Sequence, residues 1–176
     1  MTFMEAPLKG AYIMEPVRIP DERGWFMTAF TEEELRASGL ESRWAQCSLS
    51  HNARKGTLRG MHFQLEPHAE VKLVTCSRGL IHDVILDLRP GSPTFGRWHA
   101  TELSEENRRL LYVPKGFAHG FQTLEDGSEV FYHLSASYHP ELARGVRWND
   151  SAFAIQWPLE VTTISRRDQA FPDFRG

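Results

Sequence analysis

Short runs of alternating or β-branched apolar residues recur along the chain, with clusters of Gly, Pro, Asp or Asn between most of them. A period of two puts successive side chains on opposite faces of a β-strand, and the clusters favour turns. Several short strands at such spacing are typical of an antiparallel barrel or sandwich. The predicted strands cover 11–15, 25–30, 73–76, 81–88, 110–113, 129–134 and 145–148.

One segment has the pattern of a helix start. Thr31 is followed three residues later by Glu34, which is the spacing of a capping box, and Leu35 comes next. We therefore predict a helix of about two turns that begins after Thr31 and ends near Gly39. A similar spacing from Ser104 to Asn107 lies between two apolar runs and predicts a tight turn instead of a full helix.

The composition fits one globular domain. With 176 residues, of which 41% are hydrophobic, the chain can bury a core over 1–176 without disulfide or metal support. The formal net charge of −3 comes from 20 basic and 23 acidic residues with no like-charged block, so we expect no nucleic-acid or membrane partner. The first residues lack the pattern of a secretory signal, and no apolar run reaches a membrane span of roughly 18 residues. These features predict a cytoplasmic protein.

The densest cluster of unusual polar residues lies at 56–64, with the sequence GTLRGMHFQ. As a strand, this segment would turn Arg59 to one face, and His62 and Gln64 to the other. Inward polar side chains on a core strand need hydrogen-bond partners. Taken alone, His62 is more often a satisfied structural histidine than a catalytic one, so its meaning depends on the residues around it.

A second segment, at 114–121, has glycines that allow a tight turn and bring His119 to the start of the next strand. The two segments together resemble the two cupin motifs, in which H-x-H with a following Glu, and P-x-G-x-x-H, supply metal ligands inside a small β-barrel. The second motif is matched well, but Gln64 stands where the first would have its second metal-binding His. An amide is a poor ligand for zinc, iron or nickel. We therefore predict no metal and no other cofactor.

Without a metal, side chains must polarise the substrate. Arg59 and Lys72 supply positive charge, and His62 and His119 supply a base that works at neutral pH together with hydrogen-bond donors. That set suits enolate chemistry on an anionic substrate. Lys72 lies between two apolar residues, so alternation turns it to the face opposite theirs. The alternative for Lys72 is a solvent-exposed lysine.

Seven motifs follow one another in order between residues 5 and 174. Together they resemble the dTDP-4-dehydrorhamnose 3,5-epimerase family, and although each motif alone is weak, all seven in order are strong. The resemblance implies an all-β, cupin-like β-jelly roll with short peripheral helices, a homodimer, and an isomerase that epimerises a 4-keto-6-deoxy nucleotide sugar in deoxysugar biosynthesis. The motifs lie at 21–26, 58–64, 91–96, 116–121, 131–132, 144–148 and 165–168.

The resemblance also implies catalytic roles. His62 would be the base, Asp168 would orient it through a hydrogen bond, and Tyr132 would be the acid on the opposite face of the sugar. Carbons 3 and 5 both adjoin the ketone at carbon 4. One oxyanion site built by Lys72 therefore serves either enolate.

Further residues are implied to bind the nucleotide sugar. Arginine suits phosphate through its planar fork of donors, and Arg23 is implied to contact the diphosphate. Gln46 and its strand neighbours would touch the nucleoside, and Tyr138 would stack on the base. The complete set of implied substrate contacts is Arg23, Phe26, Gln46, Ser48, Arg59, His119, Tyr138 and Arg167.

Four positions depart from the family pattern, and all belong to its nucleotide and diphosphate pocket. Thr28 replaces a Glu, Ser48 an Asn, Ala143 a Glu and Arg167 a Lys. The catalytic set is intact, so these departures bear on the nucleotide and not on the reaction. A CDP- or GDP-linked sugar therefore stays an alternative to a dTDP-linked one. A single-centre epimerase or a ketoisomerase would use the same chemistry. A non-catalytic sugar-binding cupin and a metal-dependent dioxygenase are the alternatives from other classes.

Overall fold

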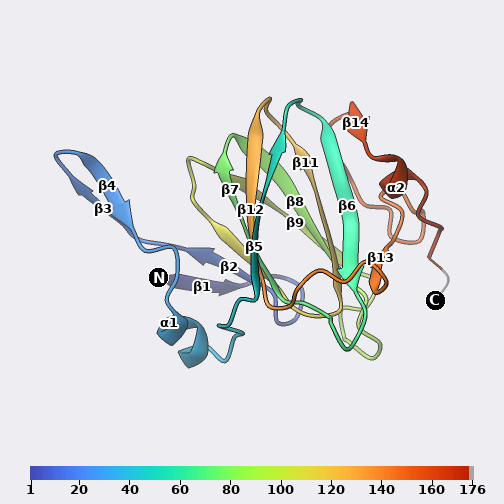
Figure 1. The fold of residues 1–176 in the computed structure, drawn as a ribbon, viewed down its shortest axis with the longest axis horizontal. Helices are drawn as coiled ribbons and strands as arrows, with labels where there is room; N and C mark the ends of the chain where they lie inside the picture. The colour runs from blue at the N-terminus through green and yellow to red at the C-terminus, as the bar shows by residue number, and fades with distance from the viewer. Residues whose placement is uncertain (175–176) are drawn as a thin grey trace.

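A computed structural model describes residues 1–174, which form two main β-sheets and a separate hairpin (Figure 1). The first sheet has the strand order β1–β2–β10–β7–β12–β5. The second has the order β13–β6–β11–β8–β9, and β14 pairs with the first two residues of β6, Thr57 and Leu58. All pairings are antiparallel except that of β14 with β6.

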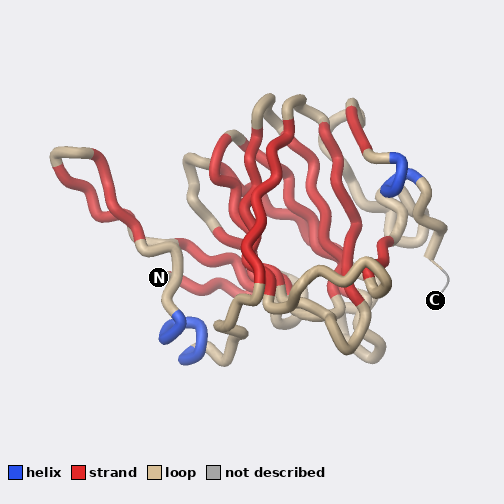
Figure 2. The backbone as a smooth tube through the Cα atoms, viewed as in Figure 1, coloured by secondary structure: helices blue, strands red, loops and turns tan. Residues whose placement is uncertain are grey.

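The element bounds show how far apart in sequence the neighbouring strands lie. The first sheet contains β1 (Thr2–Glu5), β2 (Tyr12–Glu15), β5 (Gln46–Asn52), β7 (Lys72–Arg78), β10 (Leu110–Val113) and β12 (Ser128–Leu134). The second contains β6 (Thr57–Gln64), β8 (Leu80–Asp87), β9 (Trp98–Ser104), β11 (Phe117–Thr123), β13 (Ala143–Gly145) and β14 (Thr163–Ile164). The hairpin is β3 (Arg18–Asp21) and β4 (Gly24–Met27), and the helices are α1 (Glu32–Ala37) and α2 (Arg166–Gln169). Both helices lie at the periphery (Figure 2).

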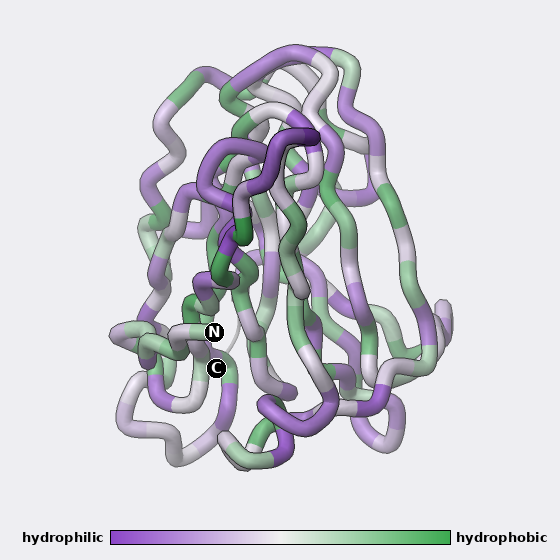
Figure 3. The backbone as a smooth tube through the Cα atoms, turned by 90° about the vertical axis from the view of Figure 1, so that its left-hand side faces the viewer, coloured by the Kyte–Doolittle hydropathy of each residue, from purple (hydrophilic) through white to green (hydrophobic). Residues whose placement is uncertain are grey.

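The main core fills the space between the two sheets. It combines side chains of the first sheet, such as Val74 and Val130, with side chains of the second, such as Ile85 and Phe121, all of them fully or almost fully buried. A second cluster around Met61 and residues of the C-terminal segment covers the second sheet, and a third, which includes Leu35 of α1, covers the first. Hydrophobic and hydrophilic positions are interleaved along the strands, as period-two patterning requires (Figure 3).

The structure confirms the predicted series of short strands, with corrections to their extent. The predicted strand at 25–30 ends at Met27, and the one at 145–148 contributes only Gly145 to β13. Val146 still exchanges two backbone hydrogen bonds with Met61, at 3.3 and 3.1 Å, so pairing continues beyond the formal strand. β1, β3, β9 and β14 were not predicted. β1 and β3 are short and largely exposed, so they lack the apolar alternation that reveals a strand.

The predicted helix is confirmed as α1. Thr31 is its N-cap, and the Thr31 Oγ accepts a hydrogen bond of 3.1 Å from the Glu34 backbone N–H. This cap satisfies a donor that the first turn leaves free, and it explains why the helix begins here. The predicted tight turn is also confirmed: Ser104 and Asn107 exchange two hydrogen bonds between backbone N–H groups and side-chain oxygens. Within residues 1–174, neither helix is long and apolar enough to cross a membrane.

The β3–β4 hairpin projects away from both sheets (Figure 1). Its base is held at the turn before β10, where Arg18 donates a hydrogen bond to the Glu106 carbonyl. The guanidinium groups of Arg18 and Arg108 both lie over the Trp25 ring, at 5.3 and 5.2 Å from its centre. Apolar side chains of this region, including Val17, remain exposed. The hairpin is therefore a fixed arm with an unburied apolar surface.

Candidate active site

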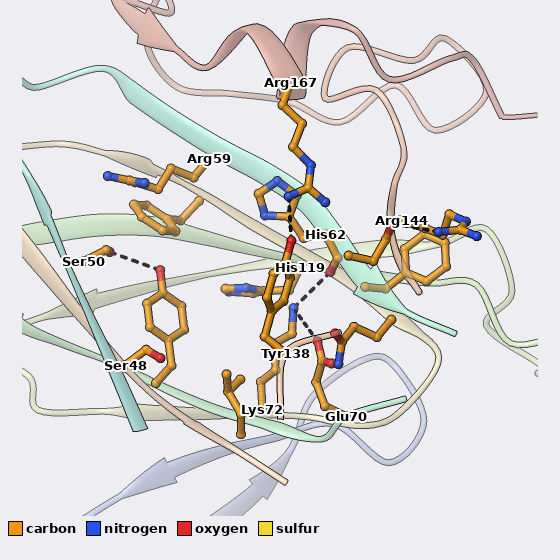
Figure 4. A pocket seen from close by; sticks show the side chains of 16 residues that line it. Ser48, Ser50, Arg59, His62, Glu70, Lys72, His119, Tyr138, Arg144 and Arg167 are labelled. Atoms are coloured by element: carbon orange, nitrogen blue, oxygen red, sulfur yellow. Dashed lines mark hydrogen bonds and ion pairs between the residues drawn. The ribbon is translucent and has the colours of Figure 1, made fainter. Parts of the chain in front are cut away.

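A cavity of about 430 Å³ has walls from both sheets, which is within the usual size range of small-molecule sites. The first sheet contributes side chains from β5, β7 and β12, and the second from β6, β11 and β13. Many of the lining groups are polar or positively charged (Figure 4). The predicted site residues that line it are Ser48, Arg59, His62, Lys72, His119, Tyr132, Tyr138 and Arg167.

His62 is hydrogen-bonded to Asp168 behind it. The His62 Nε2 lies 2.7 Å from Asp168 Oδ1, and the Asp168 side chain is buried while that of His62 is partly open to the cavity. Asp168 is held by α2, whose N-cap Ser165 accepts a 3.0 Å hydrogen bond from the Asp168 backbone N–H. The second carboxylate oxygen of Asp168, Oδ2, accepts a 3.2 Å hydrogen bond from the Gly60 backbone N–H. The geometry is that of a histidine oriented by a carboxylate.

Burial and pairing act in opposite directions on these two groups. Burial lowers the pKa of His62 below that of an ordinary histidine, although the Asp168 carboxylate favours the protonated ring. Burial also opposes ionisation of Asp168, but its hydrogen bonds with His62, Gly60 and Ser165 outweigh this and lower the pKa of the carboxyl. At neutral pH the pair therefore consists of a carboxylate and a neutral imidazole that is free to accept a proton.

The predicted strict alternation along β6 is wrong at one point. Opposite β11, His119 pairs with His62 but Phe121 pairs with Arg59, so two steps of β11 face three steps of β6. The extra residue makes a β-bulge, which reverses the alternation. Arg59 and His62, expected on opposite faces, consequently both line the cavity.

The bulge depends on a glycine. Gly60 has φ of +140°, and a Cβ added there would lie 2.6 Å from the Gly120 Cα. No L-amino acid with a side chain fits at such a distance, and few adopt this φ. Close approach of the β6 and β11 backbones therefore requires Gly60, and this contact sets the positions of Arg59 and His62.

Lys72 is buried, so the alternative of a solvent-exposed lysine is wrong. Its side chain is 10% exposed, and its Nζ donates a 3.1 Å hydrogen bond to the His62 carbonyl and lies 3.4 Å from Glu70 Oε1. Burial lowers the pKa of Lys72, and the negative charges of Glu70 and Asp83 oppose this effect. Alternation along β7 thus predicted the correct face, with the cation turned into the cavity.

Tyr132 enters the cavity from β12 in the first sheet. Its hydroxyl lies 3.3 Å from the Ser50 Oγ, and its ring makes an edge contact with His119 at 6.2 Å between ring centres. Burial strongly raises the pKa of the phenol, so it is protonated throughout the neutral range. His119 is fixed by Asp83, whose two carboxylate oxygens both lie 3.0 Å from its Nε2.

Tyr138 and its neighbours form one side of the cavity entrance. The Tyr138 side chain is 49% exposed, and its hydroxyl accepts a 3.0 Å hydrogen bond from Arg167 Nη1 (Figure 4). The Tyr138 backbone N–H donates to Gln46 Oε1 at 3.2 Å, and Gln46 Nε2 donates to Ser48 Oγ at 2.9 Å. The residues expected to contact the nucleoside and base are therefore connected to one another.

Gln64, which stands at the predicted metal-ligand position, is engaged with backbone groups. Its Nε2 donates to the carbonyls of His68 and Ser137, and its Oε1 accepts a 2.6 Å bond from the His139 N–H. The amide thereby fixes the two loops that carry Glu70 and Tyr138. Within the described part of the chain, no three His, Cys, Asp or Glu side chains are grouped to hold a metal ion.

Three predicted substrate contacts do not line this cavity: Gln46, whose Nε2 donates to the lining Ser48, and Arg23 and Phe26. Arg23 and Phe26 belong to the projecting hairpin, where Arg23 pairs with Asp21 at 2.6 Å and the Phe26 side chain is 64% exposed. Neither residue lines the cavity of its own chain. Of the four positions that depart from the family pattern, Ser48, Ala143 and Arg167 line the cavity, whereas Thr28 directly follows β4.

Two acidic residues at this site were not predicted from the sequence. Asp83 interrupts an apolar run on β8 and is completely buried, and a carboxylate between core positions is a signal that it has a specific partner. Glu70 precedes Lys72 by two residues, in a loop whose path the sequence did not predict. Each of these carboxylates lies beside a residue that was predicted, His119 and Lys72 respectively.

Comparison with known proteins gives one consistent family. A model of the dTDP-4-dehydrorhamnose 3,5-epimerase family matches residues 5–176. An enzyme of that name from Methanothermobacter thermautotrophicus is 44% identical over 176 residues, covering 98% of this chain and 94% of its own. Another from Bacillus anthracis, solved with TDP and PPi bound, has a TM-score of 0.95 and 39% identity, covering 98% of this chain and 99% of its own.

A further solved structure shares the fold at lower identity. ChmJ, a 3'-monoepimerase from Streptomyces bikiniensis in complex with dTDP-quinovose, has a TM-score of 0.89 and 32% identity, covering 96% of this chain and 85% of its own. The predicted cupin-type β-jelly roll is thereby confirmed. Given the family match over residues 5–176 and the 44% identity to a full-length relative, the chain belongs to the dTDP-4-dehydrorhamnose 3,5-epimerase family.

Proposed function

We propose that this protein epimerises a 4-keto-6-deoxy nucleotide sugar, of the dTDP-4-dehydro-6-deoxy-D-glucose type, at carbons 3 and 5. One observation carries the proposal. The His62–Asp168 pair on the second sheet and Tyr132 on the first lie on the walls of one cavity that also contains the Lys72 cation. Epimerisation needs a base and an acid on opposite faces of the sugar, and two facing sheets supply them.

The proposed reaction passes through an enolate. Because Asp168 occupies Nε2 of His62, Nδ1 is the nitrogen that accepts the proton from carbon 3 or carbon 5. Lys72, with help from Arg59 or His119, stabilises the negative charge that develops on the carbonyl oxygen. Tyr132 then donates a proton to the other face of the same carbon. Proton exchange with solvent restores the neutral His62 and the neutral phenol before the second centre reacts.

A dTDP-linked substrate is the first choice because relatives of this name act on dTDP sugars and TDP is bound in the Bacillus anthracis structure. Ser48, Ala143 and Arg167, which depart from the family pattern, line the cavity. A CDP- or GDP-linked sugar therefore stays the alternative for the nucleotide. The similarity to ChmJ, a 3'-monoepimerase, supports single-centre epimerisation as the alternative for the reaction.

Solvent exchange tests the proposal directly. The protein is incubated in heavy water with dTDP-, CDP- and GDP-linked 4-keto-6-deoxy sugars, and deuterium entry at carbons 3 and 5 is followed by NMR. Entry at both centres with one of these nucleotides is expected. Entry at a single centre would reassign the protein as a monoepimerase, and no entry with any substrate would favour a non-catalytic sugar-binding cupin.

Lys72→Ala is expected to raise the activation free energy by about 2.7 to 4 kcal/mol, as loss of one oxyanion donor does in other enzymes. The defect should lie in kcat, because the charge that Lys72 stabilises develops in the transition state. Steady-state kinetics measures it, and circular dichroism checks the fold. Near-normal turnover in Lys72→Ala would show that Lys72 does not stabilise the enolate.

The proposed active unit is a homodimer in which the β3–β4 hairpin completes the cavity of the partner subunit. Arg23 and Phe26 cannot meet a substrate in the cavity of their own chain as the hairpin lies. The hairpin region also exposes Val17, Ile19 and Phe26, each at least 60% exposed, and a second copy of the chain would bury them. Arg23 would then supply a fork of donors to the diphosphate. A cytoplasmic location and a single domain over 1–176 stay predictions of the sequence.

Mixing two inactive variants distinguishes a shared site from a separate one. His62→Ala and Arg23→Ala are purified separately, mixed, unfolded and refolded together, and assayed at low substrate concentration. If the hairpin acts on the partner, half of the dimers are mixed and each has one intact site, so about a quarter of wild-type activity returns. If each chain used its own hairpin, mixing would restore nothing beyond the average of the two variants.

A further inference from the structure

One buried carboxylate in the cavity has no part in the reaction described above. Glu70 Oε1 lies 3.4 Å from Lys72 Nζ, and the two side chains are 8% and 10% exposed (Figure 4). Within residues 1–174, Glu70 is the only acidic side chain among the lining residues, which include the four cations Arg59, Lys72, Arg144 and Arg167. A buried charge is retained only where it is paired, so each member of this pair depends on the other.

The contacts of Lys72 leave one donor for the substrate. An ammonium group has three N–H bonds. One is directed to the His62 carbonyl at 3.1 Å, and a second faces Glu70. The third is free to point into the cavity that Lys72 lines. Two fixed partners also hold the end of a flexible side chain in one position, which a single partner would not do.

The groups around Lys72 show which of them balances its charge. Its sheet neighbours on β10 and β12 are Val113 and Leu134, which are uncharged. From the second sheet it faces His62 and His119, and its own sheet contributes Tyr132 to the cavity; none of the three is an anion at neutral pH. Asp83 is a carboxylate, but it is occupied by His119 at 3.0 Å.

Glu70 is thus the anion assigned to Lys72. Burial alone would drive the buried lysine towards its neutral form, and the pairing with Glu70 is the largest opposing effect on the pKa of Lys72. A neutral amine is a much weaker donor to an oxyanion than an ammonium group is.

We infer that Glu70 is a positioning residue that keeps the Lys72 ammonium charged and aims its third N–H at the substrate carbonyl. This inference rests on the proposed role of Lys72 as oxyanion donor. Glu70 itself does not touch the reacting atoms. Its removal should therefore change the pH range of activity, because loss of the carboxylate lets Lys72 lose its proton at lower pH.

The test compares the pH profile of kcat/KM from pH 6 to 9.5 for the wild type, Glu70→Gln and Glu70→Asp. In Glu70→Gln, kcat/KM should stay within about threefold of the wild type at pH 6 and fall by about tenfold relative to it at pH 9. Glu70→Asp keeps the charge and should keep the alkaline limb near that of the wild type. Glu5→Gln is the matched control, because it makes the same chemical change at the exposed pair of Glu5 with Lys9. An alkaline limb that is the same in Glu70→Gln and the wild type would overturn the inference while leaving the proposed function intact.

A second measurement does not depend on activity. The chain has four lysines, Lys9, Lys55, Lys72 and Lys115, so the labelled side-chain signals can be assigned by comparison with Lys72→Ala. The Lys72 signal should titrate at lower pH in Glu70→Gln than in the wild type. If the wild-type protein exchanged no sugar proton, the proposed function would fail, and this titration would still decide the pairing. An unchanged Lys72 titration would overturn the role of Glu70 in either case.

Discussion

Replacing His62 by alanine is expected to lower kcat by about 10²- to 10⁴-fold, the usual contribution of a positioned general base. Deuterium entry at carbons 3 and 5 should fall together, because one base serves both centres in the proposed reaction. The other cavity histidine, His119, is fixed at its own place on β11 by both oxygens of Asp83, so its ring cannot move into the position that the His62 ring leaves. Rates are measured by NMR from the wash-in of solvent deuterium and from the appearance of product.

His99→Ala is the matched control for that experiment. His99 lies on β9 and does not line the cavity, so its loss should leave turnover within about twofold of the wild type, as for surface substitutions in general. Retention of more than a tenth of wild-type activity in His62→Ala would mean that another group removes the proton. Loss of exchange at only one carbon would instead require separate bases for the two centres.

The sequence predicted the site better where a residue lies on a regular strand than where it depends on a loop. Period-two alternation placed Lys72 on the cavity side of β7, and the buried ammonium group is found there. It failed on β6, because a bulge at Gly60 adds one residue opposite β11 and brings Arg59 to the same side as His62. A bulge leaves little trace in an apolar pattern, although an isolated glycine within a strand is one signal of it.

Contacts between distant segments were accessible only through motif resemblance. Asp168 is 106 residues from His62 in the chain, and no periodicity connects a four-residue helix near the C-terminus with β6. Neither strand alternation nor motif resemblance predicted Glu70. It belongs to no recognised motif, and its loop is fixed by the amide of Gln64. The path of the β3–β4 hairpin could likewise not be predicted. Its residues are exposed or half-buried within the chain, so its apolar positions do not indicate which part of the protein it packs against.

Tyr132→Phe is expected to separate proton exchange from inversion. The change removes only the hydroxyl, whose one hydrogen bond within residues 1–174 is with Ser50 Oγ at 3.3 Å, so the ring and its packing remain. His62 should still remove a proton and return a deuteron to the same face of the sugar. Inversion, which needs a donor on the opposite face, should fall by about 10²- to 10⁴-fold.

The ratio of the two rates is the decisive quantity. NMR in heavy water measures deuterium entry into unchanged substrate and formation of the inverted product in one sample, and Tyr12→Phe, outside the cavity, serves as the control. Exchange that continues while inversion stops assigns the acid to the β12 face of the cavity. Equal loss of both rates would instead make Tyr132 a binding residue, and unaltered inversion would assign the acid to another group. Because burial raises the pKa of this phenol above that of an ordinary tyrosine, about 10, it should remain protonated and able to donate from pH 6 to 9.5.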